Sequence, residues 1–395
     1  MKKIFLLFST LMVIQVWAKN DTPIICGAEQ LEKYLPLIKN KKLGMVVNKT
    51  SLVYKTHLVD TLLKLGIQIK FIFGPEHGFR NNASNGELVK DDFDTANRIP
   101  IISLYGKQKK PTKEQMAEID LMIFDIQDVG CRFYTYINNL RDIMEACAEY
   151  QKPLIVLDRP NPNDYVDGPI LEKELFSGIG QFPIPIVYGL TIGEFALMIN
   201  GEGWLRNNLQ ANLTIIKLNH YYHGKPYILP ISPSPNLNTQ QAIELYPTLC
   251  LFEGTAISQG RGTYFPFTVL GSPNLKGKYK FHFKPVSIKG MKENPLYENE
   301  ICYGIDLRKY KLTKLRKSKK INLTWLIELY KAFPQKDIFF DKSQHKEIGD
   351  FDKLAGTKNL KIQITENKSI SEIRASWEAG LSNYKEKYKK YWLYL

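Results

Sequence analysis

The chain has 395 residues, of which 44% are hydrophobic and 12% aromatic, so disorder over most of its length is excluded. The formal net charge of +14 is compatible with nucleic acid, but the lysine-rich stretch Lys309–Lys320 lacks an aromatic stacking pattern. A solvated lysine-rich surface is the simplest interpretation, an anionic extracellular glycan is the next, and no nucleic-acid partner is expected.

The N-terminus has the pattern of an export signal. Lys2 and Lys3 form a basic start, an apolar run from Ile4 to Trp17 follows, and Ala18 is a small residue at a plausible cleavage point. The apolar run is shorter than the roughly 20 residues that span a bilayer, and no later segment is long and apolar enough. We predict a signal peptide at 1–18, with a retained anchor as the alternative. The mature protein is then periplasmic, at the outer surface or secreted, without a stable membrane span.

From Leu43 onward, short apolar runs alternate with helical patterns. The apolar runs are separated by helices and are not themselves amphipathic, which is typical of a parallel sheet covered on both faces. The sequence therefore predicts an α/β fold. Strands are expected at 43–48, 67–73, 101–105, 121–126 and 153–158, and helices at 57–65 and 137–150.

A change in amino-acid composition near residue 240 predicts a second domain. The Pro/Ser/Asn-rich stretch 230–238 cannot form a regular helix. Beyond it we expect β-like runs at Tyr279–Phe283 and Leu360–Thr365, then a final helix from about Ser369 to Tyr388. The predicted domains are therefore residues 22–240 and 241–395.

The cysteines do not indicate a disulfide framework, because they are odd in number, widely spaced and without a CxxC pair. We expect buried, small apolar side chains, with one disulfide as the alternative. The five are Cys26, Cys131, Cys147, Cys250 and Cys302.

Polar residues stand directly after several of the predicted strands. Ligands of open α/β sheets bind at the carboxyl ends of the strands, so these residues are expected to meet at one rim. Glu76 stands after a strand and a Gly-Pro turn, where it can act as a general acid or base, and the alternative is a salt bridge to Arg80. His77 either orients Glu76 or packs.

Asp125, Asp128 and Arg132 precede an aromatic run that contains Tyr134 and Tyr136. Carboxylates accept hydrogen bonds from sugar hydroxyls, a guanidinium binds an anionic substituent, and aromatic rings stack on sugar faces. The alternative is that Asp125 caps the sheet edge and the tyrosines belong to the core.

Two later segments also contain candidate carboxylates. Thr191 and Glu194 form a capping box at a helix start, for which a structural role is favoured. In the second domain, Glu253 and Arg261 stand in glycine-containing loops that can reach back over the rim.

Several mechanisms lack their motifs. We find no GxGxxG after the first strand, no Walker A sequence, no GxSxG elbow, no HExxH and no convincing zinc cluster. What remains is carboxylate chemistry, chiefly glycoside hydrolysis, which needs two placed carboxyl groups and neither metal nor cofactor.

Five motifs stand at 73–80, 125–136, 158–162, 234–237 and 253–263. In this order they resemble the exo-β-N-acetylmuramidase family, formerly a domain of unknown function, and the likeness extends from about Cys26 to the C-terminus. Asn81-Asn82 departs from the expected glycine nearby, which leaves the shape of that loop open. A further match lies at 351–357.

The resemblance implies a Rossmann-like N-terminal domain, a smaller α+β C-terminal domain and an active site in the cleft between them. It implies release of N-acetylmuramic acid from the non-reducing end of peptide-free peptidoglycan glycan, with Glu76 as the best catalytic candidate. The other catalytic candidates are His77 and, for a second carboxylate, Asp125, Asp128 or Glu253. Candidate substrate contacts are Asn48, Arg80, Arg132, Tyr134, Tyr136, Asp158, Arg159, Asn161, Asn236 and Arg261.

Muramic acid carries a lactyl carboxylate, which Arg132 or Arg261 could bind in bidentate geometry. Two alternatives to the glycosidase stay open. One is a non-catalytic protein that binds cell-wall glycan, and the other is an amidase or deacetylase acting on the same polymer.

Overall fold

In this computed structural model the described residues are 22–395, except 77, 80–91, 95–97 and 107. The predicted signal peptide and the candidates His77 and Arg80 lie outside the described residues. Within that part of the chain, no helix is long and apolar enough to cross a membrane.

The N-terminal half is built on one seven-stranded sheet with the order β11-β8-β7-β1-β4-β6-β5. Neighbouring strands from β11 to β6 are parallel, and only the edge strand β5 is antiparallel. The predicted α/β class is confirmed, as are all five predicted strands. Their bounds are β1 (Lys42–Val47), β4 (Gln68–Gly74), β5 (Asp92–Phe93), β6 (Pro100–Ser103), β7 (Leu121–Asp125), β8 (Leu154–Leu157) and β11 (Leu213–Ile216).

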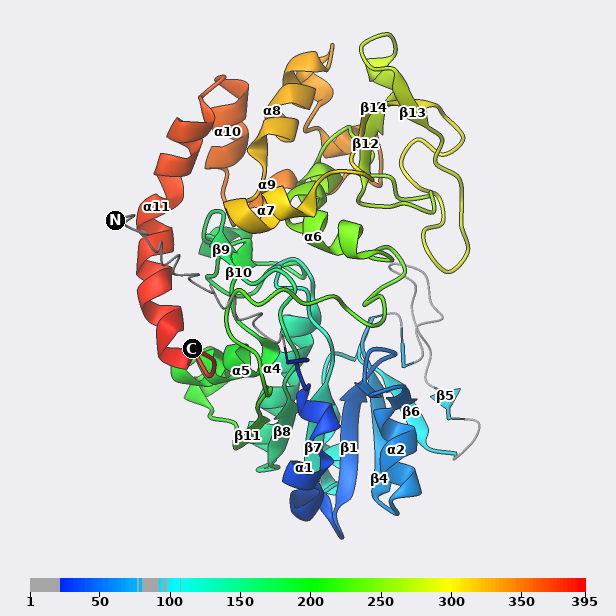
Figure 1. Cartoon of the computed structure of the whole chain (residues 1–395), viewed down its shortest axis with the longest axis vertical. Helices are drawn as coiled ribbons and strands as arrows, with labels where there is room; N and C mark the ends of the chain where they lie inside the picture. The colour runs from blue at the N-terminus through cyan, green and yellow to red at the C-terminus, as the bar shows by residue number, and fades with distance from the viewer. Residues whose placement is uncertain (1–21, 77, 80–91, 95–97, 107) are drawn as a thin grey trace, which may run out of the picture.

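Both faces of this sheet are buried because successive side chains of each strand enter different cores. Met45 and Val47 of β1 pack in one core together with α1 and α2, whereas Val46 packs in the other core together with α4 and α5. Figure 1 shows these helices around the sheet. Their bounds are α1 (Leu31–Ile38), α2 (Leu58–Lys64), α3 (Lys113–Ala117), α4 (Tyr136–Glu149) and α5 (Ile192–Gly201). Two short antiparallel strand pairs accompany the sheet, the hairpin of β2 (Leu52–Val53) with β3 (Thr56–His57) and the pair of β9 (Val166–Asp167) with β10 (Val187–Tyr188).

The rest of the chain is α+β. A three-stranded antiparallel sheet in the order β12-β14-β13 lies among helices, above the carboxyl ends of the long sheet in Figure 1. The stretch 230–238 has no helix or strand, as predicted. The elements are α6 (Gln240–Leu249), β12 (Val269–Ser272), β13 (Phe281–Phe283), β14 (Cys302–Asp306), α7 (Leu312–Ser318), α8 (Leu323–Ala332), α9 (Phe351–Ala355), α10 (Asn359–Thr365) and α11 (Ile370–Tyr388).

The strand predicted at Leu360–Thr365 is wrong, because this segment is the helix α10. The alternating apolar residues suggested a period of two. In the structure, Leu360 and Ile364 are buried on one helical face and Ile362 between them is 48% exposed. Burial therefore follows the helical spacing of four.

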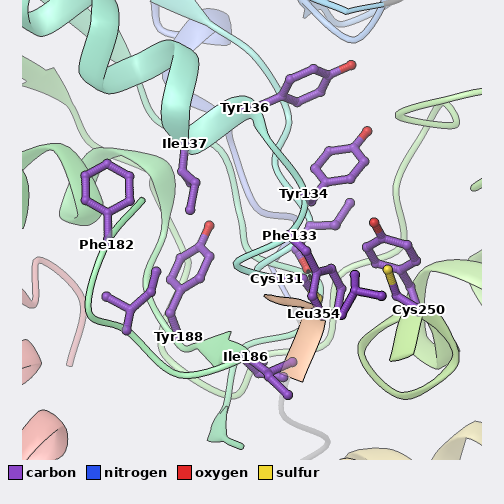
Figure 2. Packing of buried hydrophobic residues seen from close by; sticks show 14 of the residues in the cluster. Cys131, Phe133, Tyr134, Tyr136, Ile137, Phe182, Ile186, Tyr188, Cys250 and Leu354 are labelled. Atoms are coloured by element: carbon purple, nitrogen blue, oxygen red, sulfur yellow. Dashed lines mark hydrogen bonds between the residues drawn. The ribbon is translucent and has the colours of Figure 1, made fainter. Parts of the chain in front are cut away.

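One continuous core joins the two parts of the molecule. Leu354 and Cys250 from the second part pack beside Cys131 and Phe133 from the first (Figure 2). Helix α11 runs alongside both parts (Figure 1), and the hydroxyl of its Tyr384 donates to the carbonyl of Tyr188 over 2.7 Å. All five cysteines are buried and free, which confirms the expectation that they behave as small apolar side chains.

Candidate active site

A cavity of about 740 Å³ lies where the carboxyl ends of the sheet face the second part of the molecule. Its walls come from the loops after β4, β6 and β7, from the outer face of α4, and from the segments around η4 (Cys250–Gly254) and α9. Six of the predicted site residues line it. These are Glu76, Tyr134, Tyr136, Asn236, Glu253 and Arg261.

Glu76 enters the cavity from a tight turn after β4. The amide of Gly78 donates to the carbonyl of Pro75 over 2.9 Å, and Gly78 has a positive φ of 77°. A Cβ on Gly74 would stand 3.1 Å from the amide nitrogen of Phe79, so a side chain there would crowd the turn. The glycines of the motif thus allow the backbone to fold back and present Glu76. Burial, together with the charge of Glu76 and a hydrogen bond to it, raises the pKa of Tyr105.

Two tyrosines form an aromatic wall beside Glu76. Tyr134 and Tyr136 pack edge to face with ring centroids 4.8 Å apart, and Tyr246 of α6 adds a third ring 6.0 Å from Tyr134. The buried Asn48 lies behind this wall, and its Nδ2 donates to the hydroxyl of Tyr136 over 3.1 Å. Burial raises the pKa of Tyr136, so its phenol is neutral. Asn48 therefore orients a cavity residue and does not itself line the cavity.

The second part of the molecule contributes an ion pair to the opposite wall. Arg261 places Nη2 2.6 Å and Nε 2.8 Å from Oε1 of Glu253, and its guanidinium lies over the ring of Phe267 at 4.9 Å. Burial acts to lower the pKa of Arg261, but the charge and hydrogen bond of Glu253 outweigh it and raise the pKa. The buried Nη1 of Arg261 has no acceptor among the described residues. The loop does reach the rim, as expected from the sequence.

Asn236 lines the same cavity from the irregular 230–238 segment. It is buried, and its Nδ2 donates to the carbonyl of Met291 over 2.9 Å, which fixes the amide. Its Oδ1 has no donor within the described part of the chain. A fixed amide with an open acceptor is suited to recognising a substrate hydroxyl or N–H.

The outer face of α4 is a polar wall of the cavity whose residues are not among the predicted site residues. Asn138, Arg141, Asp142 and Glu145 line the cavity at spacings of three and four, and Lys110 bonds Glu145 over 3.0 Å. The polar residues at this spacing within the predicted helix 137–150 were the signal in the sequence that could have indicated this wall. Glu347 and Asp350 also line the cavity, from a loop that gave no such signal.

Several strand-end candidates lie beneath the rim and do not line this cavity. Asp125 and Arg159 are buried and form an ion pair of 2.5 Å. Asp158 is buried at the N-terminus of α5, where it accepts from the amide of Gly193 and the hydroxyl of Thr191, each over 2.8 Å. Thr191 and Glu194 form the predicted capping box. Asn161 is also buried, and its Nδ2 donates to the carbonyl of Leu190 over 2.9 Å.

Asp128 is buried below the aromatic wall and does not line the cavity either. Its Oδ2 accepts from the amide of Gly130 over 2.6 Å and from the hydroxyl of Tyr188, and its Oδ1 has no donor within the described residues. Burial raises the pKa of Asp128 to about 7. In the same part of the chain, no group of three His, Cys, Asp or Glu residues is placed to hold a metal ion.

The structure gives Arg132 a different role from the expected substrate contact. Its side chain is entirely buried and donates to the carbonyls of Pro169, Ile184 and Leu354 over 2.8 to 3.1 Å. Burial lowers the pKa of Arg132 to about 9. Because Leu354 belongs to α9, Arg132 connects the two parts of the molecule and is out of reach of a ligand in the cavity.

The fold and the site together define an α/β protein with a second α+β part, in which carboxylates, aromatic rings and an arginine line one shared cavity. The chain belongs to the family of exo-β-N-acetylmuramidase NamZ. Residues 43–241 match the model of the N-terminal domain of that family, and residues 244–394 match the model of its C-terminal domain.

Individual relatives agree with this assignment. The chain is 34% identical to the peptidoglycan β-N-acetylmuramidase NamZ of Bacillus subtilis strain 168 over 92% of this chain and 89% of that protein. Crystal structures of two DUF1343 family proteins from Bacteroides fragilis each match 94% of this chain and 99% of theirs. Their TM-scores are 0.86 and 0.79, at 43% and 28% identity.

Proposed function

We propose that this protein is an exo-acting glycoside hydrolase that releases N-acetylmuramic acid from the non-reducing ends of peptidoglycan-derived glycans. Its family and the name of its Bacillus subtilis relative support this substrate. The observation that carries the proposal is that Glu76 and Glu253, from the two parts of the molecule, line one cavity together with an aromatic wall. Two carboxyl groups in one cavity are what glycoside hydrolysis requires.

In this proposal Glu76 is the general acid. It donates a proton to the glycosidic oxygen as the bond to the anomeric carbon breaks. Water supplies the hydroxyl that replaces the leaving group, and the proton that this water loses restores the acid form of Glu76. Glu253 is the second carboxylate, which stabilises the positive charge that develops at the anomeric carbon. Its pairing with Arg261 holds it in place, since Nε of the guanidinium donates to Oε1 of Glu253 and Nη2 forms an ion pair with the same oxygen.

Substrate recognition follows from the other residues of the cavity. The rings of Tyr134 and Tyr136 offer a surface for a sugar face, and the open acceptor of Asn236 receives a hydroxyl or an amide N–H. Arg261 binds the lactyl carboxylate of muramic acid through Nη1, the nitrogen that Glu253 leaves without a partner. That contact distinguishes muramic acid from glucosamine.

We also propose that the protein is exported and acts in the periplasm or outside the cell. The basic start, apolar run and small residue of segment 1–18 support this location. Expression of the full chain followed by fractionation and N-terminal sequencing tests it. A mature N-terminus near residue 19 in the exported fraction is expected, and an uncleaved protein in the cytoplasm would contradict it.

The activity is tested with the purified protein and a chromogenic β-N-acetylmuraminide, followed by a muramyl-glucosamine disaccharide. Free N-acetylmuramic acid is the expected product. Release of acetate from the disaccharide, or of peptide from a peptide-bearing fragment, would instead indicate a deacetylase or an amidase. Binding without any product would indicate a glycan-binding protein.

A further inference from the structure

A second cavity of about 540 Å³ lies away from the candidate active site and shares no lining residue with it. One side is formed by the end of α7 and the residues after it and the other by α11, and the β9–β10 strand pair contributes residues between them. Figure 1 shows this strand pair next to α11, with α7 close by. We call this cavity the basic groove, after its cations Lys319, Lys320, Arg374 and Lys385.

The charges of the basic groove do not cancel. Arg374 is neutralised by Asp167, with Nη1 at 3.0 Å from Oδ1. Asp164 is bonded to His223 over 2.8 Å and to Tyr221 over 3.0 Å. Of the charged groups left over, Glu378 and the α-carboxylate of Leu395 are the anions, and three lysines outnumber them.

Those three lysines are available to a ligand. Lys319, Lys320 and Lys385 form no ion pair or side-chain hydrogen bond with any described residue. Lys319 and Lys320 are exposed on one side of the groove, and Lys385 is half-buried on the other. A cleft lined by one sign of charge concentrates ligands of the opposite sign.

The groove also offers aromatic surface. Tyr388 and Trp392 line it, with their rings edge to face at 5.3 Å. Trp392 is supported from behind by His223, stacked at 4.5 Å, so its position is fixed. Rings beside unpaired ammonium groups match a sugar polymer that carries anionic substituents, because the sugar packs on the rings and the anions meet the lysines.

We propose that the basic groove is a second glycan-binding site, which holds a carboxylate-bearing glycan strand while the main cavity acts on chain ends. The choice of strand rests on the proposed function, since the lactyl groups of peptide-free peptidoglycan glycan supply recurring carboxylates. Cations on both sides of the groove favour an extended ligand over a single small anion. The site retains the enzyme on polymeric substrate and takes no part in bond cleavage.

The test uses the full mature protein, with Lys319, Lys320 and Lys385 all changed to alanine. Binding to immobilised, peptide-free glycan strands is measured at low and high salt, alongside turnover of the muramyl-glucosamine disaccharide. We expect binding to weaken about fivefold to tenfold at low salt and the difference to shrink as salt screens the charges. Turnover of the disaccharide should be unchanged.

A matched control removes the same charge elsewhere. Lys276, Lys278 and Lys280 are exposed and line neither the main cavity nor the basic groove, so their triple alanine variant should bind strands as the wild type does. Equal losses in both variants, or no loss in the groove variant, would overturn the proposal. Strands with amidated carboxyl groups should bind the wild type as weakly as native strands bind the groove variant. The binding measurement needs no hydrolysis, so an inactive wild type would refute the proposed function alone.

Discussion

Asp125 and Arg159 form a buried, bidentate ion pair. Nε of Arg159 lies 2.5 Å from Oδ1 of Asp125, and Nη2 of Arg159 lies 2.9 Å from Oδ2. Nη2 also donates to the carbonyl of Leu52 over 3.2 Å. The pair thus connects the end of β7, the loop after β8 and the β2–β3 hairpin directly below the rim. Because both side chains are buried below the rim, the pair supports the site from beneath and does not contact a substrate.

Replacing Asp125 with Asn should therefore destabilise the protein strongly. The guanidinium of Arg159 would stay buried without its counter-charge, which costs about 3–5 kcal/mol. Urea unfolding measures this loss. Glu174 is exposed, and its Gln variant should change stability by less than about 0.5 kcal/mol. If Asp125→Asn is as stable as the wild type yet inactive, Asp125 belongs to the chemistry.

The strands were predictable because a parallel strand buried on both faces has a simple signature, a continuous apolar run between helices. The rim was only partly predictable. Asp125 ends β7 and Asp158 follows β8, but both turn into the protein, whereas Tyr134 and Tyr136 lie farther along the chain and reach the cavity. The order of residues shows where a strand ends. It does not show which side chains the neighbouring elements enclose, and α5 encloses Asp158.

Changing Glu76 to Gln removes the proton donor and keeps the shape of the side chain. We expect kcat on the disaccharide to fall by a factor of about 100 to 10,000 with little change in KM, since general acid catalysis contributes about that much. A matching melting temperature would show that the variant is folded. Near-wild-type turnover would exclude Glu76 as the acid.

The identity of the second carboxylate is tested by comparing Glu253→Gln with Asp128→Asn. Glu253 lines the cavity and Asp128 does not, so only the first variant should lose activity, by about 100-fold or more. Asp128 has its pKa raised to about 7 by burial, so a neutral amide of the same shape is compatible with its site. The reverse ranking of the two variants would assign the role to Asp128.

Arg261→Ala should change specificity more than it changes overall folding. Its Nη1 is the open donor for a lactyl carboxylate, so kcat/KM should fall about 10-fold to 100-fold more on muramic-acid-terminated than on glucosamine-terminated substrates. Arg132→Ala is the contrasting variant. Because Arg132 donates to three carbonyls in the core, its loss should lower the melting temperature without altering the ratio of the two substrates. An equal loss by Arg261→Ala on both substrates would refute the lactyl contact.

The stability of the protein should depend on pH through His223. Its Nδ1 lies 2.8 Å from Asp164 and its Nε2 3.0 Å from Glu194. Burial acts to lower the pKa of His223, but the hydrogen bonds to both carboxylates outweigh it and raise the pKa to about 9. The folded pKa is thus above the unfolded value of about 6.5, so the charged imidazolium favours the folded state.

That contribution should be fully present below pH 6.5, decline above it, and be lost as pH rises through about 9. The difference in unfolding free energy between the wild type and His223→Gln should therefore shrink by on the order of 2 kcal/mol between pH 6 and pH 9.5. Urea unfolding across this pH range measures that difference. The contributions of other titrating groups such as Asp158 cancel in it because both proteins carry them. His282 is exposed, and His282→Gln should show no such trend. A constant difference between wild type and His223→Gln would mean that His223 is not held in its charged form.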